Sequence, residues 1–247
     1  MRQYWRGLLA GSSLVACFVA PPAWAFTRDE AEATAHLLAV LLDAGREVID
    51  RNQTLIDDPH RGFKGFTPEA FEAQLGQEFR TRAGIALDRL DAAPLPRPTR
   101  DLLSTLVQAS KDVVADAQVV INQRGIGYKN FIPATFGSQA AARFSKRSPV
   151  RLKQTARHPR NPKNEPDNYE AAVLDRLMSL PGPSAPVSEL TDDGKTLRML
   201  SPIYYDQACL KCHGGPAGEQ DVSGYPKEGA TLGSLAGAIS VMMPLDR

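Results

Sequence analysis

The chain has 247 residues, of which 43% are hydrophobic, and its 29 basic and 28 acidic residues leave a formal net charge of +1. This balance argues against a nucleic-acid-binding protein, because such proteins concentrate positive charge to neutralise phosphates. The length is sufficient to bury a core, so the three cysteines are not needed as disulfide staples.

Residues 1–25 have the pattern of a signal peptide. Arg2 and Arg6 supply the positive start, an apolar run follows over residues 7–19, and residues 23–25 (Ala-Trp-Ala) match a small–x–small cleavage site. The apolar run is too short to span a bilayer as a permanent helix. We therefore expect export to the periplasm and a mature chain that begins at Phe26.

An alternative processing site lies inside this leader. Leu14-Val15-Ala16-Cys17 resembles a lipobox, after which Cys17 would become a lipidated first residue and a membrane anchor. Against it, the sequence stays apolar after Cys17 and the Ala-Trp-Ala site follows. We favour cleavage after Ala25, and in either case the domain works outside the cytoplasm.

An internal repeat links the first half of the chain with its middle. When the sequence is shifted by 65 positions without a gap, the 51 positions from 37 to 87 contain 16 identical residues. The matched residues include Pro, Lys, Gln and Phe, so biased composition does not explain them. We interpret the repeat as a duplicated helix–loop–helix unit.

Each copy is predicted to be helical. Apolar residues recur at three- and four-residue steps over residues 37–49 and again over residues 102–114. After a loop, Pro68 and Pro133 stand where a second helix can begin, since proline suits the first helical turn. The proline-rich stretch 91–98 is a linker between the two copies.

Only the second copy continues into predicted strands. The elements expected there are strands at 150–155, 196–205 and 235–245 and a capped helix over 167–180. Helices that precede a small antiparallel sheet predict an α+β fold. We therefore divide the mature chain into a helical repeat unit (26–95) and a second domain (96–247).

Cys209, Cys212 and His213 form a C-x-x-C-H sequence, the attachment pattern of a c-type haem. Two thiols three residues apart can each form a thioether with a haem vinyl group, and the next histidine becomes an axial ligand of the iron. Covalent attachment suits an exported protein, and residues 26–247 contain no other cysteine. We predict one covalent haem c per chain.

Other chemistries use the same cysteines. A thioredoxin-like dithiol needs C-x-x-C at the start of a helix in a βαβ unit, whereas the following Gly214-Gly215-Pro216 prevents a regular helix. A structural zinc site needs four ligands, and His36, His60 and His158 are isolated in the sequence. A simple disulfide of an exported protein is the remaining alternative.

Residues 100–245 resemble a family of exported single-haem domains. Arg160-Asn161-Pro162-Lys163-Asn164-Glu165-Pro166-Asp167, followed by Glu170, resembles the R-N-P-x-N-x-P-D…E signature of that family. Residues 131–136, 201–203 and 237–241 and the C-x-x-C-H motif also stand where that family has them. The resemblance implies a PAS-like five-stranded sheet that carries a c-type haem, and a role in sensing redox state or a small ligand.

The second axial position of the predicted haem iron has several candidates. They are His36, His60, His158, Met199, Met242, Met243 and water. His36 is expected in a core or a dimer face, His60 in an exposed loop, and His158 is the best placed by family position. The methionines lie in predicted strands, where core packing is the ordinary role. The sequence assigns no distal ligand.

Basic residues near the second copy are candidates to pair with haem propionates. A first cluster comprises Arg143, Lys146, Arg147, Arg151 and Lys153, for which a solvated face is the simpler interpretation. Arg157 and Arg160, in the signature loop, are better placed for such a pair.

The motifs favour a binding protein over an enzyme. No nucleophile elbow, zinc-protease motif or phosphate loop is present, and no distal acid–base pair of a peroxidase can be identified. We expect a periplasmic haem-based sensor of redox state or of a small gaseous ligand, with a soluble electron-transfer cytochrome as the alternative. Either role needs a partner protein, and the repeated helices offer a surface for a partner or for a homodimer.

Overall fold

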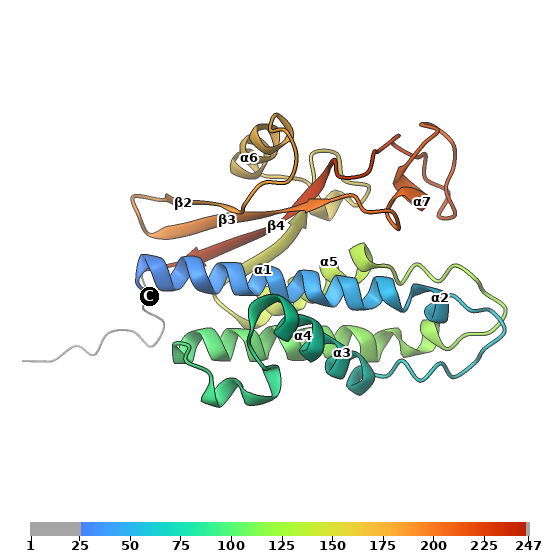
Figure 1. The fold of residues 1–247 in the computed structure, drawn as a ribbon, viewed down its shortest axis with the longest axis horizontal. Coiled ribbons are helices and arrows are strands. Elements are labelled where there is room, and N and C mark those ends of the chain that lie inside the picture. Colours follow the sequence, from blue (N-terminus) through green and yellow to red (C-terminus); the bar gives the residue numbers. More distant parts are fainter. Residues whose placement is uncertain (1–25, 246–247) are drawn as a thin grey trace, which may run out of the picture.

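The computed structural model describes residues 26–245, which combine a layer of helices with an antiparallel sheet (Figure 1). The predicted signal peptide and Cys17 lie outside the described residues. Within the described range, no helix is long and apolar enough to cross a membrane. The helical elements are α1 (Arg28–Arg51), α2 (Gln53–Ile56), α3 (Pro68–Ala83), η1 (Leu87–Ala92), α4 (Arg97–Ile121), α5 (Pro133–Arg147), η2 (Pro162–Asn164), α6 (Asn168–Met178) and α7 (Leu210–His213).

Local sequence signals start and stop these helices. At the head of α1, the Thr27 hydroxyl accepts the backbone N–H of Glu30, and the Glu30 carboxylate accepts the N–H of Thr27 in return. Pro68 and Pro133 open α3 and α5, which confirms both predicted starts. Helix α3 ends at Gly84, whose φ of +70° is a left-handed conformation that suits glycine.

The sequence repeat is a structural repeat. Helices α1 and α3 of the first copy correspond to α4 and α5 of the second, and the four pack together below the sheet (Figure 1). In each copy, the loop between the two helices donates an equivalent hydrogen bond to the other copy. The backbone N–H of Lys64 donates to Asn122 Oδ1 at 3.0 Å, and that of Lys129 donates to Asp57 Oδ1, also at 3.0 Å. Because Asn122 and Lys129 lie 65 residues after Asp57 and Lys64, the exchange is reciprocal and indicates an internal two-fold relation.

The sheet has four antiparallel strands in the order β1-β4-β3-β2. They are β1 (Arg151–Thr155), β2 (Val187–Thr191), β3 (Thr196–Tyr204) and β4 (Leu235–Pro244). The three predicted strands and the predicted helix α6 are present, and the fold is α+β. The expectation of five strands is wrong for the described residues, and β2 is an edge strand that the prediction missed.

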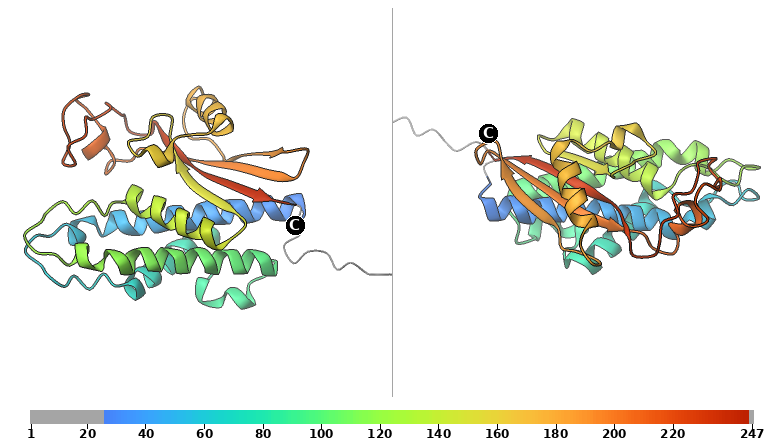
Figure 2. Two further views of the ribbon diagram at one scale, coloured as in Figure 1. Left: turned by 180° about the vertical axis from the view of Figure 1, so that it is seen from behind. Right: turned by 90° about the horizontal axis from the view of Figure 1, so that it is seen from above.

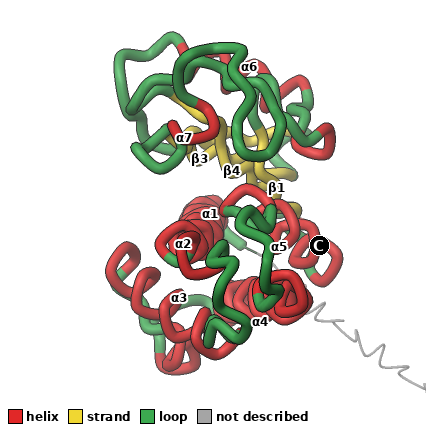
Figure 3. Tube along the Cα trace, turned by 90° about the vertical axis from the view of Figure 1, so that its right-hand side faces the viewer, coloured by secondary structure: helices red, strands yellow, loops and turns green. Residues whose placement is uncertain are grey.

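The two faces of the sheet pack against different helices. Helices α1 and α5 cover one face and α6 lies on the other, as the end-on view in Figure 3 shows. Side chains alternate accordingly along the strands. Leu197 and Met199 of β3 join the helical core, whereas Leu200 packs with Leu174 of α6.

One hydrophobic core joins the two copies of the repeat to the sheet. It includes Leu38 of α1, Leu103 of α4, Phe136 of α5 and Val241 of β4, all of them fully buried. The predicted division at residues 95 and 96 stays a prediction, and this core crosses it.

Candidate functional site

The C-x-x-C-H motif forms a single helical turn between β3 and β4. It lies beyond the end of the sheet, on the side where the loops of the helical repeat turn back (Figures 1 and 2). Asp206 Oδ1 accepts the backbone N–H of Cys209 at 2.9 Å and fixes the start of the turn. The turn closes at Gly214, where a Cβ atom would stand 2.5 Å from the carbonyl oxygen of Leu210. The predicted break after His213 is confirmed.

Both cysteines of the motif are free thiols and half-buried. Their spacing of three residues places them on the same side of one helical turn. Burial raises the pKa of Cys209 to about 11, and burial, followed by the nearby charge of Asp221, also raises the pKa of Cys212. Both thiols are therefore protonated at neutral pH, the opposite of a reactive dithiol, whose thiol pKa is lowered.

The imidazole of His213 is held by a carboxylate. Its Nδ1 atom lies 2.8 Å from Glu228 Oε2, and its side chain is 31% exposed. The Tyr205 ring lies beside it, with the ring centroids 5.3 Å apart. Among residues 26–245, Nδ1 is the ring nitrogen with a hydrogen-bond partner, which leaves Nε2 for a ligand.

Arg160 ties the motif to the signature loop. Its Nη2 donates to the carbonyl oxygen of Cys212 at 2.9 Å, and its Nε and Nη2 donate to the two carboxylate oxygens of Glu228 at 2.6 and 3.0 Å. Its Nη1 donates to Asp221 Oδ2 at 2.6 Å. This bidentate, charge-assisted arrangement fixes both geometry and charge, so one guanidinium orders the loop after the motif.

Asp221 and Glu228 are the acidic counterparts of Arg160. The Asp221 side chain is fully buried. Burial alone raises the pKa of Asp221, but hydrogen bonds from Ser223, Arg160 and the backbone N–H of Tyr225 together hold it well below its ordinary value. The pKa of Glu228 is also lowered, by Arg160 and His213 against the effect of burial. Both groups are therefore ionised at neutral pH.

The remaining signature residues shape the fold around this loop. The Asn161 side chain accepts the backbone N–H of Lys163 and caps η2. Asp167 and Glu170 form a capping box that starts α6, as expected from the sequence. Glu170 is buried, and its carboxylate accepts from Lys153 Nζ at 2.8 Å. The signature therefore positions Arg160 beside Cys212 and fixes the helix on the outer face of the sheet.

Helix α1 and the second repeat loop contribute residues that sequence reasoning missed. The charge of Arg46 opposes the burial that raises the pKa of Cys209, and it adds to the hydrogen bonds of Cys209 that lower the pKa of Asp206. Arg46 Nε is buried and has no hydrogen-bond partner among the described residues. Burial raises the pKa of Tyr128 in the second repeat loop, and the Cys212 thiol group adds to this rise.

The histidine candidates for the second axial position lie apart from one another. His36 is exposed on α1, so a core position is wrong and a dimer face stays a prediction. His60 is exposed in its loop, as expected. His158 is exposed beside Arg160, at a hollow of about 490 Å³ that the signature loop lines.

The methionines have the core role that the sequence indicates. Met199 and Met243 are buried in the main core, and Met242 is half-buried in β4. In residues 26–245, no three His, Cys, Asp or Glu side chains converge as a metal site. Among the described residues, the imidazole of His213 contacts Glu228 and Tyr205.

The basic residues proposed for propionates divide into two groups. Arg143 pairs with Asp116, Arg147 pairs with Asp112 at 2.7 Å, and Lys153 pairs with the buried Glu170. Lys146 and Arg151 are exposed. Arg157 pairs with Asp175 of α6 at 2.7 Å. Of all these candidates, Arg160 is the one that contacts the motif.

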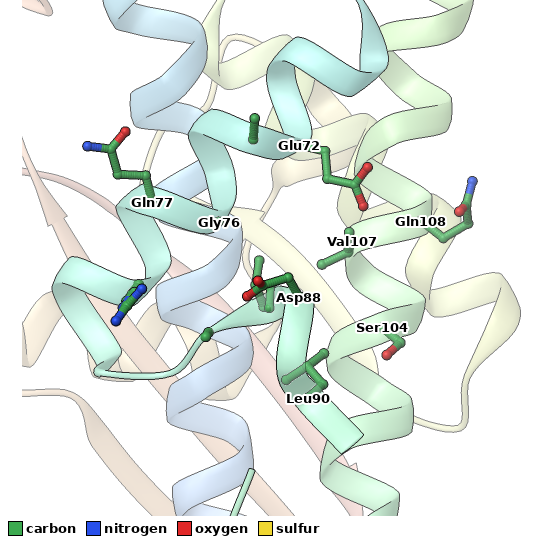
Figure 4. Close-up of a pocket in the computed structure, with 12 residues that line it drawn as sticks. Glu72, Gly76, Gln77, Asp88, Leu90, Ser104, Val107 and Gln108 are labelled. Atoms are coloured by element: carbon green, nitrogen blue, oxygen red, sulfur yellow. The ribbon is translucent and has the colours of Figure 1, made fainter. Parts of the chain in front are cut away.

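A hollow of about 580 Å³ lies in the helical layer, between α3, η1 and α4 (Figure 4). Its lining is mixed, with Glu72 and Gln77 of α3 and Ser104 and Val107 of α4 around it. Neither a cysteine nor a histidine is among the residues that line it. This hollow therefore has no part in the C-x-x-C-H site.

Comparison with known proteins identifies the family. No curated protein matches the chain significantly. The search of solved structures found the "cyanobacterial heme-protein Tll0287", with 18% sequence identity, a TM-score of 0.39, and coverage of 60% of this chain and 96% of that one. The sequence profile of the Tll0287-like family matches residues 25–244, which include the C-x-x-C-H motif. The chain belongs to the Tll0287-like family.

Proposed function

We propose that this chain is an exported haem protein with one haem c bound covalently through Cys209 and Cys212, with His213 as an axial ligand. The observation that carries the proposal is the geometry of the motif. Two free thiols lie on one turn, and the adjoining imidazole is fixed through Nδ1 so that Nε2 is available. Bound haem would supply an iron centre whose redox state or outer ligand can change.

The family supports haem binding independently of this geometry. The protein from which the family takes its name is described as a haem protein. The match includes the whole segment that carries Cys209, Cys212 and His213. Arg46 pairs with Asp43 through Nη1 and has a buried Nε–H without a partner among the described residues, a candidate donor for an acidic group of the cofactor.

The role that we propose is sensing of redox state or of a small gaseous ligand in the periplasm, without catalysis. The leader over residues 1–25 supports export, and lipidation at Cys17 is the alternative form. Met199 and Met243 are core residues, and His36, His60 and His158 are exposed, which supports an outer iron position open to water or to a small ligand. A second copy or a separate partner protein would receive the signal.

Electron transfer is the second candidate. The motif lies at one end of the molecule, its cysteines are half-buried, and the side chain of His213 is 31% exposed. A cofactor held by these residues would be accessible to a partner protein, which suits electron exchange. Carbon monoxide distinguishes the two roles, because it binds to a reduced iron with an open or labile position.

The test uses the full chain expressed in the periplasm with a haem-attachment system. We expect haem to stay with the protein after acid–acetone extraction, and a Cys209→Ala/Cys212→Ala double variant to lose it. Addition of carbon monoxide to the reduced protein should then shift the absorption spectrum. Retained haem with an unchanged spectrum would favour electron transfer, whereas complete loss of haem from the unmodified protein would refute the proposal.

A further inference from the structure

The carboxylate of Glu228 has two neighbours that together determine its position. Its Oε2 atom lies 2.8 Å from His213 Nδ1 and 3.0 Å from Arg160 Nη2, and its Oε1 atom lies 2.6 Å from Arg160 Nε. A long acidic side chain on a surface loop ordinarily samples several rotamers. Here the guanidinium donates hydrogen bonds to both oxygens, so the carboxylate is already oriented where it meets His213.

Arg160 is itself held by further contacts. Its Nη2 atom also donates to the carbonyl oxygen of Cys212, the residue before His213, and its Nη1 atom donates to the buried Asp221. The Cζ atom of Arg160 lies over the ring of Tyr225, 5.4 Å from the ring centroid. The backbone of the cysteine turn and the partner of the imidazole are thus held by the same side chain.

An ionised carboxylate accepts hydrogen bonds and cannot donate them. A neutral imidazole opposite Glu228 therefore carries its proton on Nδ1 and presents the lone pair of Nε2. A carboxylate in this second position increases the basicity of a ligating histidine, as it does in metal sites generally. Increased basicity favours the more highly charged ferric iron over the ferrous form.

We propose that Glu228, held by Arg160, is the positioning residue of the axial histidine, and that its negative charge lowers the reduction potential of the bound haem. This inference rests on the proposed function, because it concerns the same site. It adds a regulating carboxylate that neither the C-x-x-C-H motif nor the signature contains. Tyr205, whose ring centroid lies 5.3 Å from that of His213, restricts rotation of the imidazole from another side.

The experiment compares haem-loaded full chains that carry single substitutions. Glu228→Gln keeps the shape and an accepting oxygen but removes the charge. Glu219→Gln is the matched control, because Glu219 lies in the same loop and pairs with Lys227 at 3.3 Å. Covalent haem content, the midpoint potential from spectroelectrochemical titration and the urea midpoint would be measured for each protein.

We expect Glu228→Gln to retain its haem and to shift the reduction equilibrium toward ferrous iron about tenfold, which is about 59 mV for a one-electron couple. Glu219→Gln should have the potential of the unmodified protein. If Glu228→Gln does not fold, Arg160→Lys provides a second variant, since it keeps the positive charge and loses the two parallel hydrogen bonds to Glu228. A smaller shift in the same direction is expected for it.

Two results would overturn the proposal, and each can be told apart from failure of the proposed function. Equal potentials for the haem-loaded Glu228→Gln, Glu219→Gln and unmodified proteins would show that Glu228 only holds the loop. If no protein retains haem, the proposed function and the effect on the potential both fail. In that case ¹⁵N NMR of the haem-free chain still tests the tautomer, and a proton on Nε2 of His213 would refute the positioning role.

Discussion

The hydroxyl groups of Thr34 and Thr99 lie 2.7 Å apart, although 65 residues separate them in the chain. This separation equals the offset of the sequence repeat, so the two threonines occupy equivalent places in the two copies. Equivalent residues of two related units meet only near the axis that relates them. The hydrogen bond therefore marks the internal two-fold axis between α1 and α4.

A double-mutant cycle at this axis should show strong coupling. Both threonines are 1% exposed, so Thr34→Val leaves the hydroxyl of Thr99 buried without its partner. We expect a loss of about 1–3 kcal/mol in the free energy of unfolding for either single variant, and a much smaller loss for the double variant. Urea unfolding followed by circular dichroism measures all four proteins.

A half-buried threonine of α4 provides the control for this cycle. The Thr105 hydroxyl donates to the backbone oxygen of Asp101 at the edge of α4, so Thr105→Val should change the unfolding free energy by less than about 0.5 kcal/mol. Strictly additive losses at Thr34 and Thr99 would contradict a direct interaction across the axis.

The close approach of α1 and α5 gives a second prediction, at Gly45. A Cβ atom at this position would lie 2.7 Å from Cε1 of Phe136, whose ring also packs on Phe71 with centroids 5.2 Å apart. We expect Gly45→Ala to cost about 1–3 kcal/mol through overpacking. Gly76→Ala in α3 is the matched control, since a Cβ there meets nothing within 4 Å. Alanine at position 76 should stabilise the chain by about 0.5–1 kcal/mol.

Thermal and urea unfolding of the two alanine variants separate packing from helix propensity. Both substitutions gain the same propensity, so the difference between their unfolding free energies reports the contact with Phe136. A Gly45→Ala protein as stable as Gly76→Ala would show that Phe136 moves aside without cost.

The elements that the sequence predicts correctly depend on local or repeated signals. Pro68 and Pro133 mark helix starts wherever the rest of the chain lies, and the 65-residue offset itself reveals the two copies. The C-x-x-C-H turn is short, and Gly214 and the residues after it end it locally. Such signals need no knowledge of tertiary contacts.

The missed edge strand shows where local signals are weak. Strand β2 has no fully buried residue, and Leu190 is 37% exposed. Its clearest signal is the following turn, where Asp192, Asp193 and Gly194 all have positive φ.

The ion network around Arg160 could not be derived from the sequence. Asp221 and Glu228 lie more than 60 residues after Arg160, in a loop without regular periodicity, and only the fold brings them together. The role of Arg46 on α1 could not be derived from the sequence either. A search for carboxylates near the histidine of the motif would have named Glu228, but also Glu219 and Asp221, and the residue pattern does not choose among them.

Asp221 makes stability depend on pH in the acid range. Hydrogen bonds from Ser223, Arg160 and Tyr225 lower its pKa in the folded chain, whereas the unfolded chain has a pKa near the ordinary 3.8. The folded form therefore binds fewer protons just below this pH. The stabilisation by Asp221 is complete above pH 3.8 and is lost as the pH falls toward the folded pKa.

Asp221→Asn should remove this part of the acid sensitivity. At pH 7 we expect a loss of about 2–3 kcal/mol in the free energy of unfolding, because the charge-assisted bond with Arg160 is lost. Between pH 5 and pH 2 the difference from the unmodified protein should shrink. Asp193→Asn, at an exposed turn position, is the control. A difference that stays constant down to pH 2 would contradict the role of Asp221.

The thiols distinguish haem attachment from dithiol chemistry before any haem is bound. Burial raises the pKa of Cys209 to about 11, so in a haem-free Cys212→Ser variant this thiol should react slowly with iodoacetamide at neutral pH. Allowing for the greater nucleophilicity of a more basic thiolate, we expect alkylation about tenfold slower in the folded than in the urea-unfolded chain at pH 7. The rate should keep rising up to about pH 11.

The shape of this pH profile decides between the two chemistries of the motif. A thiol–disulfide enzyme needs a thiolate near neutral pH, and its alkylation rate would level off by about pH 8. The Cys209→Ser variant provides the matched measurement on Cys212, whose pKa is raised by burial and then by Asp221. A plateau near neutral pH for either thiol would favour redox exchange over passive attachment. If the alkylation rates of both thiols keep rising with pH, the turn of Cys209, Cys212 and His213 is suited to hold a cofactor rather than to exchange disulfides.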